Sequence, residues 1–221
     1  MTFGSLGNRT LFANCSDGAG NVNSTSATAI SVVDTTPPTF DFTPQNQTIE
    51  GGQAFTYDVN ASDNFALGSY RISNNNFSIN NNGTIRNATT LVVGTSLLNI
   101  SVNDSSGNSR STIISVIIQD TTSPTISIIS PMNQTYGSAI ILVNISTGDN
   151  VGVSRIWYNF NGTNITYTTS LNVNFSEGSH TIYAYANDSA GNVNSTLRVF
   201  YVNTSLPNII VNSPINTSYN R

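Results

Sequence analysis

The chain has 221 residues, of which only 8% are charged, and it carries a formal net charge of −4. Its basic residues are seven arginines, which the acidic residues outnumber, so the chain lacks the basic face that nucleic-acid binding requires, and this function class is excluded. None of its apolar runs approaches the roughly 18 residues that span a bilayer, so we expect no membrane span.

One pattern repeats along the chain: a strand, a turn of the form Asp-x-x-Gly-Asn, a second strand, and a linker that contains proline. The turn aspartates are Asp17, Asp104 and Asp188. In these turns we expect glycine and asparagine, as at Gly107 and Asn108, because both tolerate positive φ. A period of about 85 residues is too long for a solenoid or propeller and predicts tandem domains.

The repeat divides the chain into four expected segments. The start lacks the basic and apolar regions of a signal peptide, so we interpret the chain as an internal piece of a longer protein. The segments are the C-terminal part of a β-sandwich repeat (1–36), a cadherin-like β-sandwich (37–121), an immunoglobulin-like β-sandwich (122–205) and the start of a further repeat (206–221).

Alternating and β-branched residues predict short strands throughout, with no helical period. In the first segment we expect strands at 10–15 and 28–33, with Cys15 as a small buried hydrophobe. The strands expected in the first complete module are 55–61, 70–72, 77–79, 83–85, 90–93, 98–104 and 112–118. Those expected in the second are 126–130, 141–145, 153–160, 165–168, 171–175, 181–187 and 197–202.

Seven short strands separated by turns are typical of a two-sheet sandwich of the immunoglobulin type. The Asp104-x-x-Gly107-Asn108 turn, followed by Asp120-Thr-Thr-x-Pro124, resembles the tandem immunoglobulin-like and cadherin-like repeats of prokaryotic (archaeal or bacterial) cell-surface proteins. Residues 77–85 are similar to a cadherin strand pair, although the acidic cadherin motif after it is replaced by residues 87–91. The resemblance implies an all-β fold of tandem immunoglobulin-like (cadherin/fibronectin-type) β-sandwich domains.

The resemblance also implies a non-enzymatic structural or adhesion role in a rod-like segment of a larger glycosylated protein, located outside the cell or at its surface. Short proline-containing linkers favour such a rod. Expected partners are other copies, cell-surface proteins or glycans. The alternatives are a ligand- or carbohydrate-binding module, or a spacer appended to an extracellular enzyme. Catalysis within the chain is not expected, because the single histidine, His180, is interpreted as a loop residue without a nucleophile placed to use it.

Calcium is the one cofactor that the sequence suggests. In such a sandwich the linker enters at the end where two loops meet, and cadherins bind calcium with acidic residues from these places. Without a cation the grouped carboxylates would repel one another, whereas a hard divalent ion takes 6–8 oxygen ligands. The alternative is that these aspartates only stabilise their turns, since aspartate suits each of these turns. The candidate ligands are Asp34, Asp63, Asn64 and Asp104, then Asp120, Asp149, Asn150 and Asp188.

Sequons for N-glycosylation are strongly enriched. They account for 19 of 33 asparagines, whereas the 58 serines and threonines predict about 9 by chance. The reversed pattern occurs only 7 times, and strand alternation has no direction, so we predict heavy N-glycosylation over a merely asparagine-rich composition. The sequons begin at Asn8, Asn14, Asn23, Asn46, Asn60, Asn76, Asn82, Asn87, Asn99, Asn103, Asn133, Asn144, Asn161, Asn164, Asn174, Asn187, Asn194, Asn203 and Asn216.

Aromatic residues on two strands of the second module point away from its expected core. On the strand 153–160, the residues that alternate with Trp157 are better suited to the core, so Trp157 is expected to point outward. Tyr183 and Tyr185 alternate with inward residues on their own strand and are expected to point outward too. These three side chains either pack across strands or form a contact surface for a partner or a sugar ring.

Overall fold

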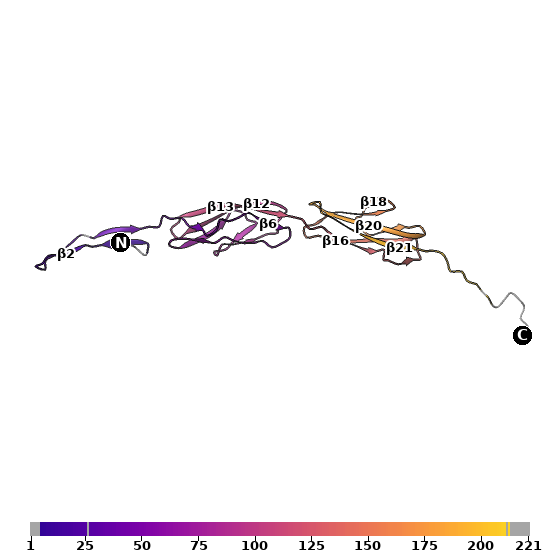
Figure 1. Cartoon of the computed structure of the whole chain (residues 1–221), viewed down its shortest axis with the longest axis horizontal. Coiled ribbons are helices and arrows are strands. Elements are labelled where there is room, and N and C mark those ends of the chain that lie inside the picture. The colour runs from indigo at the N-terminus through magenta and orange to yellow at the C-terminus, as the bar shows by residue number, and fades with distance from the viewer. Residues whose placement is uncertain (1–4, 26, 211, 213–221) are drawn as a thin grey trace, which may run out of the picture. The chain divides into compact units, whose positions relative to one another are not determined.

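The computed structural model describes residues 5–25, 27–210 and 212, and it divides the chain into two units, Met1–Gln119 and Asp120–Arg221. Within the described residues every regular element is a strand (Figure 1). The expected all-β fold is therefore confirmed. Residues 211 and 213–221 of the expected further repeat, with the sequon of Asn216, lie outside the described residues, as does the start of the chain at residues 1–4.

The N-terminal part of the first unit forms two small antiparallel sheets. Strand β1 (Gly7–Leu11) pairs with β4 (Thr28–Val32), and β2 (Asn14–Ser16) pairs with β3 (Val22–Ser24). The expected strand at 10–15 is thus interrupted. The prediction that Cys15 is buried is wrong: its side chain is exposed. The reason is that β2 and β3 pair only with each other, so no second sheet covers them within the described residues.

The remainder of the first unit is a sandwich. One sheet has the order β6-β13-β12-β9, with bounds Gln47–Glu50, Ser109–Gln119, Gly94–Asp104 and Leu67–Ile72. A second sheet has the order β10-β11-β7, with bounds Phe77–Ile79, Thr84–Asn87 and Thr56–Asp58, and β5 (Thr39–Phe40) pairs with β8 (Ala61–Ser62). The inward residues of both sheets form one core that includes Phe77, Ile85, Leu98, Ile100 and Val116.

Two strands expected in this module differ. The strand 55–61 is broken at Val59, because the chain leaves β7, which pairs with β11, and enters β8, which pairs with β5. Gly83, at φ 82°, lies against this break, and its carbonyl accepts a hydrogen bond from the backbone of Val59. The strand expected at 90–93 is irregular, because only Leu91 turns into the core and Val92 is exposed.

The second unit is a sandwich of a five-stranded and a three-stranded sheet. The larger has the order β15-β21-β20-β17-β18, with bounds Thr135–Tyr136, Val193–Val202, Gly178–Asp188, Val153–Phe160 and Thr163–Thr166. The smaller has the order β14-β16-β19, with bounds Thr125–Ser130, Ile140–Gly148 and Leu171–Asn174. The seven expected strands are present within a few residues, whereas β15, which pairs in parallel with β21, was not expected.

His180 is not the loop residue that the sequence suggested. It lies within β20, is 8% exposed, and packs against the rings of Phe160, Phe175 and Phe200 at centroid distances of 5.4–5.7 Å. Its Nε2 atom is 2.7 Å from the carbonyl oxygen of Ser176. The strand begins at Gly178, earlier than expected, and this extension carries His180 into the core.

Candidate functional site

Each Asp-x-x-Gly-Asn turn is closed by its own aspartate. Asp104 Oδ1 accepts hydrogen bonds from the backbone N–H groups of Ser106 and Asn108, and its Oδ2 accepts one from Asn108 Nδ2 at 2.7 Å. Asp17 and Asp188 receive the same 2.7 Å bond from the asparagine four residues later. The repeated motif therefore encodes one hydrogen-bonded turn, in which Gly107 has a φ of 94°.

The asparagine of the turn has a role that the sequence analysis did not identify. Asn108 was expected to tolerate positive φ, but among the described residues other than glycine only Asn161 has a positive φ. Instead, Asn108 Nδ2 also donates to the carbonyl oxygen of Asp34 at 3.1 Å, and Asn192 Nδ2 donates to that of Asp120 at 3.0 Å. The recurrence of asparagine at this turn position was the available signal.

These bonds help to hold an aspartate from the linker beside two aspartates from loops. In the first unit the structure brings together Asp34, Asp63 and Asp104, and in the second Asp120, Asp149 and Asp188. In each group, one carboxylate oxygen from every member lies within 4.8 Å of those of the other two. Asp34, Asp104, Asp120 and Asp188 are buried, and the remaining member of each group is half-buried.

In several of these carboxylates, one oxygen accepts hydrogen bonds and the other accepts none among the described residues. Asp63 Oδ1 accepts from the backbone of Phe65 and Ala66, and Asp149 Oδ1 accepts from that of Val151 and Gly152. Their Oδ2 atoms, like Asp34 Oδ2, are buried and accept no hydrogen bond within the described part of the chain. A buried carboxylate oxygen without a partner is costly, so turn chemistry alone leaves these three oxygens unexplained.

The two asparagines proposed as helpers are both exposed. Asn64 Nδ2 donates to Asp34 Oδ1 at 3.3 Å, so its amide already faces the first group. Rotation of the amide by half a turn would present Oδ1, the atom that a cation needs. Asn150 directly follows Asp149 in the loop of the second group.

The turn aspartates are held in their charged form. Burial would raise the pKa of Asp104, but hydrogen bonds from Asn108, Ser106 and Gly107 outweigh it and leave the pKa below its ordinary value of 3.8. The pKa of Asp188 is lowered for the same reasons, with Asn192 as the main donor. Each group therefore retains its turn aspartate as an anion at neutral pH.

The atoms that could bind a metal in both groups are carboxylate oxygens, which suit a hard divalent cation such as calcium. Three carboxylates, with nearby carbonyl groups and water, can supply the 6–8 ligands that calcium takes at 2.3–2.6 Å. The residues present thus fit a calcium ion in number and chemistry, and calcium binding stays a prediction.

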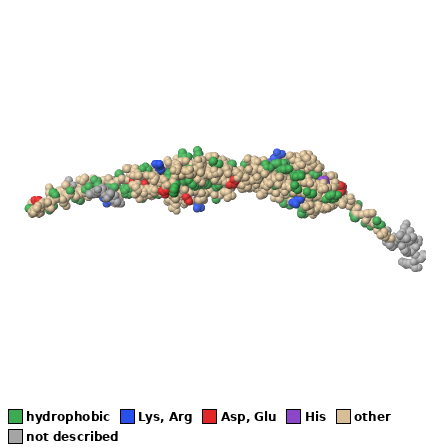
Figure 2. Space-filling model, viewed as in Figure 1, with side chains coloured by type: hydrophobic (Ala, Val, Ile, Leu, Met, Phe, Trp, Pro, Cys, Tyr) green, Lys and Arg blue, Asp and Glu red, His purple; other side chains and the backbone are tan. Residues whose placement is uncertain are grey.

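The predicted aromatic residues lie on the outward face of the five-stranded sheet. Trp157 on β17 and Tyr185 on β20 are cross-strand partners, and their rings stack at 5.3 Å with an interplanar angle of 7°. The Arg155 guanidinium lies 5.6 Å from the centre of the Trp157 ring, and Tyr183 is 43% exposed. Figure 2 shows hydrophobic side chains gathered on the visible face of the second unit. Cross-strand packing is therefore present, and the face remains accessible.

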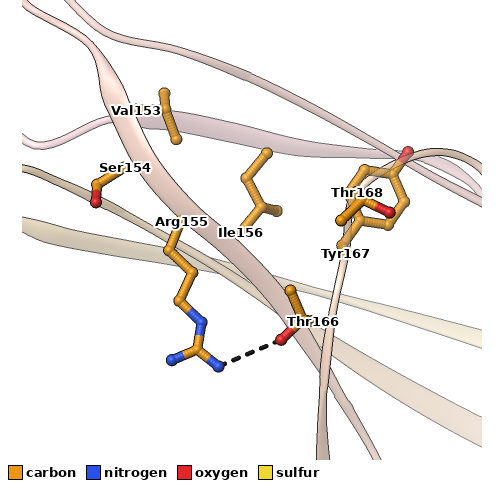
Figure 3. A pocket seen from close by; sticks show the side chains of 7 residues that line it. All are labelled: Val153, Ser154, Arg155, Ile156, Thr166, Tyr167 and Thr168. Carbon is orange, nitrogen blue, oxygen red and sulfur yellow. Dashed lines mark hydrogen bonds between the residues drawn. The ribbon is translucent and has the colours of Figure 1, made fainter.

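A groove lies beside this face, where β17 and β18 part. It has a volume of about 250 Å³ and is lined by residues 153–156 and 166–168 (Figure 3). The Arg155 side chain lies along one side of the groove, and its Nη2 donates a hydrogen bond to Thr166 Oγ1 at 3.3 Å. Ligand pockets usually measure about 300–1,000 Å³, so this groove is small for an enclosed ligand.

The sequon asparagines are distributed over both units. Of the 18 in the described residues, 14 are exposed and none is buried. The half-buried four are Asn87, Asn103, Asn144 and Asn187.

Each unit contains a β-sandwich, so the chain has the fold of tandem immunoglobulin-like domains. Residues 124–184, in the second unit, match the family model of the bacterial Ig domain. No curated protein matches the chain.

Solved structures with similar folds are distant in sequence. The fibronectin(III)-like modules of Clostridium thermocellum CbhA are 17% identical, with 79% of this chain and 98% of that chain covered and a TM-score of 0.36. Titin domains Z1Z2, solved in complex with telethonin, are 13% identical, with 77% and 97% covered and a TM-score of 0.46. Extracellular cadherin domains 1–4 of protocadherin gamma B7 are 18% identical, with 89% and 57% covered and a TM-score of 0.37.

None of the described residues belongs to a helix long and apolar enough to cross a membrane.

Proposed function

We propose that this chain is a non-enzymatic, rod-like structural and adhesion segment of a larger N-glycosylated protein at a cell surface. We further propose that a calcium ion binds to each of its two groups of three aspartates. The match to the bacterial Ig domain supports the structural role, because such domains generally lack catalytic activity. Other copies, surface proteins and glycans are the partners that this role implies.

The observation that carries the proposal is the recurrence of the same three-carboxylate group in both units. In each unit an aspartate of the linker meets one aspartate from a loop and one from the closing turn. Asp34 Oδ2 and Asp63 Oδ2 in the first group, and Asp149 Oδ2 in the second, are buried without a hydrogen bond in the described part of the chain. A calcium ion would satisfy these oxygens and would fix the linker to the body of its own unit.

The exposure of most sequon asparagines supports glycosylation. A transferase would move an oligosaccharide from a lipid-pyrophosphate donor to asparagine Nδ2. The bond from sugar C1 to nitrogen forms, the bond from C1 to the pyrophosphate breaks, and the nitrogen loses a proton. Intact-mass analysis of native material tests this directly, since a bare polypeptide mass would contradict glycosylation.

Calorimetry with and without calcium tests the acidic groups. We expect a dissociation constant of roughly 10⁻⁴–10⁻³ M, as in extracellular calcium modules. At tenfold above the dissociation constant, linkage gives about 1.4 kcal/mol, or a rise in melting temperature of roughly 5–10 °C. An unchanged melting temperature at 10 mM calcium would reject the calcium site and leave turn chemistry as the role of these aspartates.

The decisive variants are Asp63→Asn and Asp149→Asn, combined in one chain. Asparagine keeps the Oδ1 acceptor that each turn uses and replaces only the unpartnered Oδ2. Without calcium we expect the variant to melt at the same or a higher temperature, because it removes one of three like charges. With calcium it should lose the stabilisation. Asp58→Asn, an exposed aspartate on β7, is the matched control and should retain the full response.

A further inference from the structure

The outward face of the five-stranded sheet in the second unit carries apolar residues in adjacent register positions. Tyr183 on β20 lies opposite Leu197 on β21, and their exposed fractions are 43% and 52%. Val199 and Tyr201 continue the row along β21, with exposed fractions of 42% and 47%. An apolar sheet face of this kind marks a surface that another group covers.

Trp157 and Tyr185 complete this face on the side toward β18. Their rings stack in parallel, so one flat face of each ring is covered by the other ring, and the Arg155 guanidinium lies over the Trp157 ring. Both side chains are half-buried, and the outer parts of the stacked pair stay accessible on this face. The exposed ring of Tyr183 and the open edge of the stacked pair offer apolar surface to the C–H groups of a sugar ring, while the hydroxyl groups at the rim of the sugar stay in water.

A sequon lies on the same face. β18 carries Asn164 opposite Asn159 and Thr166 opposite Trp157, so both ends of the Asn164-Ile165-Thr166 sequon are in register with the face. Asn159 is in turn opposite Tyr183 on β20. Neighbouring strands lie about 4.8 Å apart, so Asn164 is roughly 10 Å from Tyr183 across the sheet, a span of about two sugar rings.

The side chain of Asn164 is set for attachment. It is exposed, and its Oδ1 atom accepts a hydrogen bond from Asn159 Nδ2 at 2.7 Å. This bond orients the amide and leaves Nδ2, the atom that would bear the sugar, without a hydrogen bond among the described residues.

The first unit shares one part of this arrangement, a sequon asparagine beside exposed apolar side chains, here aliphatic ones. On the outward face of its four-stranded sheet the sequon residue Asn99 lies directly opposite Ile113, which is 65% exposed. Leu97, two positions along the same strand, is 64% exposed. Both units therefore place a sequon asparagine on their exposed apolar sheet face.

We propose that the saccharide attached to Asn164 lies across Trp157, Tyr183 and Tyr185 and covers this face of the second unit. The proposal rests on the N-glycosylation proposed above and assigns one glycan a defined place on the protein. A tethered saccharide is favoured over a free one because its attachment point is in register with the face. The neighbouring groove, at about 250 Å³, is small for a free ligand.

Trp157 is the only tryptophan of the chain, so its fluorescence reports on this face alone. The experiment measures acrylamide quenching of natively glycosylated chain and of Asn164→Gln from the same host. A saccharide that covers about half of the Trp157 surface left open by Tyr185 and Arg155 should hinder acrylamide to the same degree, so the quenching constant should rise about twofold in the variant. Asn174→Gln, which removes an exposed sequon on β19 in the other sheet, is the control and should leave quenching unchanged.

Glycopeptide mass spectrometry on the same samples separates this proposal from the one it rests on. If Asn164 carries a glycan and Asn164→Gln quenches like the native chain, the packing proposal is overturned and glycosylation stands. If the whole chain carries no glycan, both proposals fail. Glycans elsewhere with Asn164 bare would overturn only the packing proposal.

The bare chain from a host without N-glycosylation provides a second measurement that does not depend on the variant folding. We expect it to match Asn164→Gln in quenching. Strong protection of Trp157 in the bare chain, growing with protein concentration, would instead identify a second copy as the group that covers the face and would overturn the proposal.

Discussion

Asn108 donates a hydrogen bond from its side-chain amide to the carbonyl oxygen of Asp34 at 3.1 Å, across 74 positions of the chain. The same nitrogen donates to Asp104 Oδ2 at 2.7 Å, so one side chain joins the closing turn to the linker. Asn192 repeats this arrangement with Asp120 and Asp188 in the second unit. Each linker is therefore fastened to its unit without any metal.

The first prediction concerns this fastening. Asn192→Ala removes both hydrogen bonds and leaves their buried acceptors without this donor, so we expect the melting temperature of the second unit to fall by roughly 5–10 °C. Calorimetry or circular dichroism measures the change. Asn172→Ala, at an exposed position on β19, is the control and should shift the midpoint by at most about 2 °C. Equal effects of the two variants would contradict the role assigned to Asn192.

The second prediction concerns pH. The pKa values of Asp104 and Asp188 are lowered in the folded chain from 3.8. A lowered folded-state pKa gives stability that is present above the unfolded value and is lost as pH falls through the folded value. We therefore expect these two residues to contribute no pH dependence between about pH 5 and 8, and stability to fall below about pH 4.

The contribution of these hydrogen bonds to the pH dependence can be isolated. In a chain with both Asn108→Ala and Asn192→Ala, the pKa values of the two aspartates should return toward 3.8, because Asn108 and Asn192 are their principal hydrogen-bond donors. The acid-induced loss of stability should then be shallower, as measured by melting temperature from pH 2 to 6. An identical pH profile in the double variant would contradict this assignment.

The third prediction compares two glycines that both have positive φ. A Cβ added to Gly83 would lie 2.1 Å from the carbonyl oxygen of Val59, whereas one added to Gly107 meets nothing within 4 Å. Gly107→Ala should cost only the backbone strain of about 1 kcal/mol, and Gly83→Ala should cost at least about 3 kcal/mol because the backbone must also move. Denaturant unfolding measures both, and similar losses would contradict the close approach of Gly83 to Val59.

The fourth prediction concerns which sequons are used. Asn87 Oδ1 accepts from Phe55 and its Nδ2 donates to Thr89, while Asn103 Oδ1 accepts from Ser69 and its Nδ2 donates to Asp104. A glycan on Nδ2 would disturb these bonds, so we expect low occupancy at both sites. Asn60 and Asn99, whose exposed side chains make no hydrogen bond among the described residues, should be well occupied. Glycopeptide mapping of native protein decides between this pattern and uniform occupancy.

Much of the fold could be predicted from the sequence because its signals are local. Alternation along 98–104 and 112–118 predicted the hairpin that the structure forms as β12 and β13. The repeated Asp-x-x-Gly-Asn turn is likewise formed by residues within five positions of one another. The grouping of linker and loop aspartates was expected from the sandwich topology, and the structure places the corresponding carboxylates together.

What the sequence by itself determined was therefore the strands, the turns and the repeat, since each depends on neighbours along the chain. Only the tertiary structure decided the features that depend on distant partners. The break at Val59 requires Gly83 beside it, and the burial of His180 requires three phenylalanine rings, from β17, from β21 and from the residue after β19. The second bond of Asn108 likewise needs the Asp34 carbonyl, which folding brings close from 74 positions away, and no local pattern encodes such a contact.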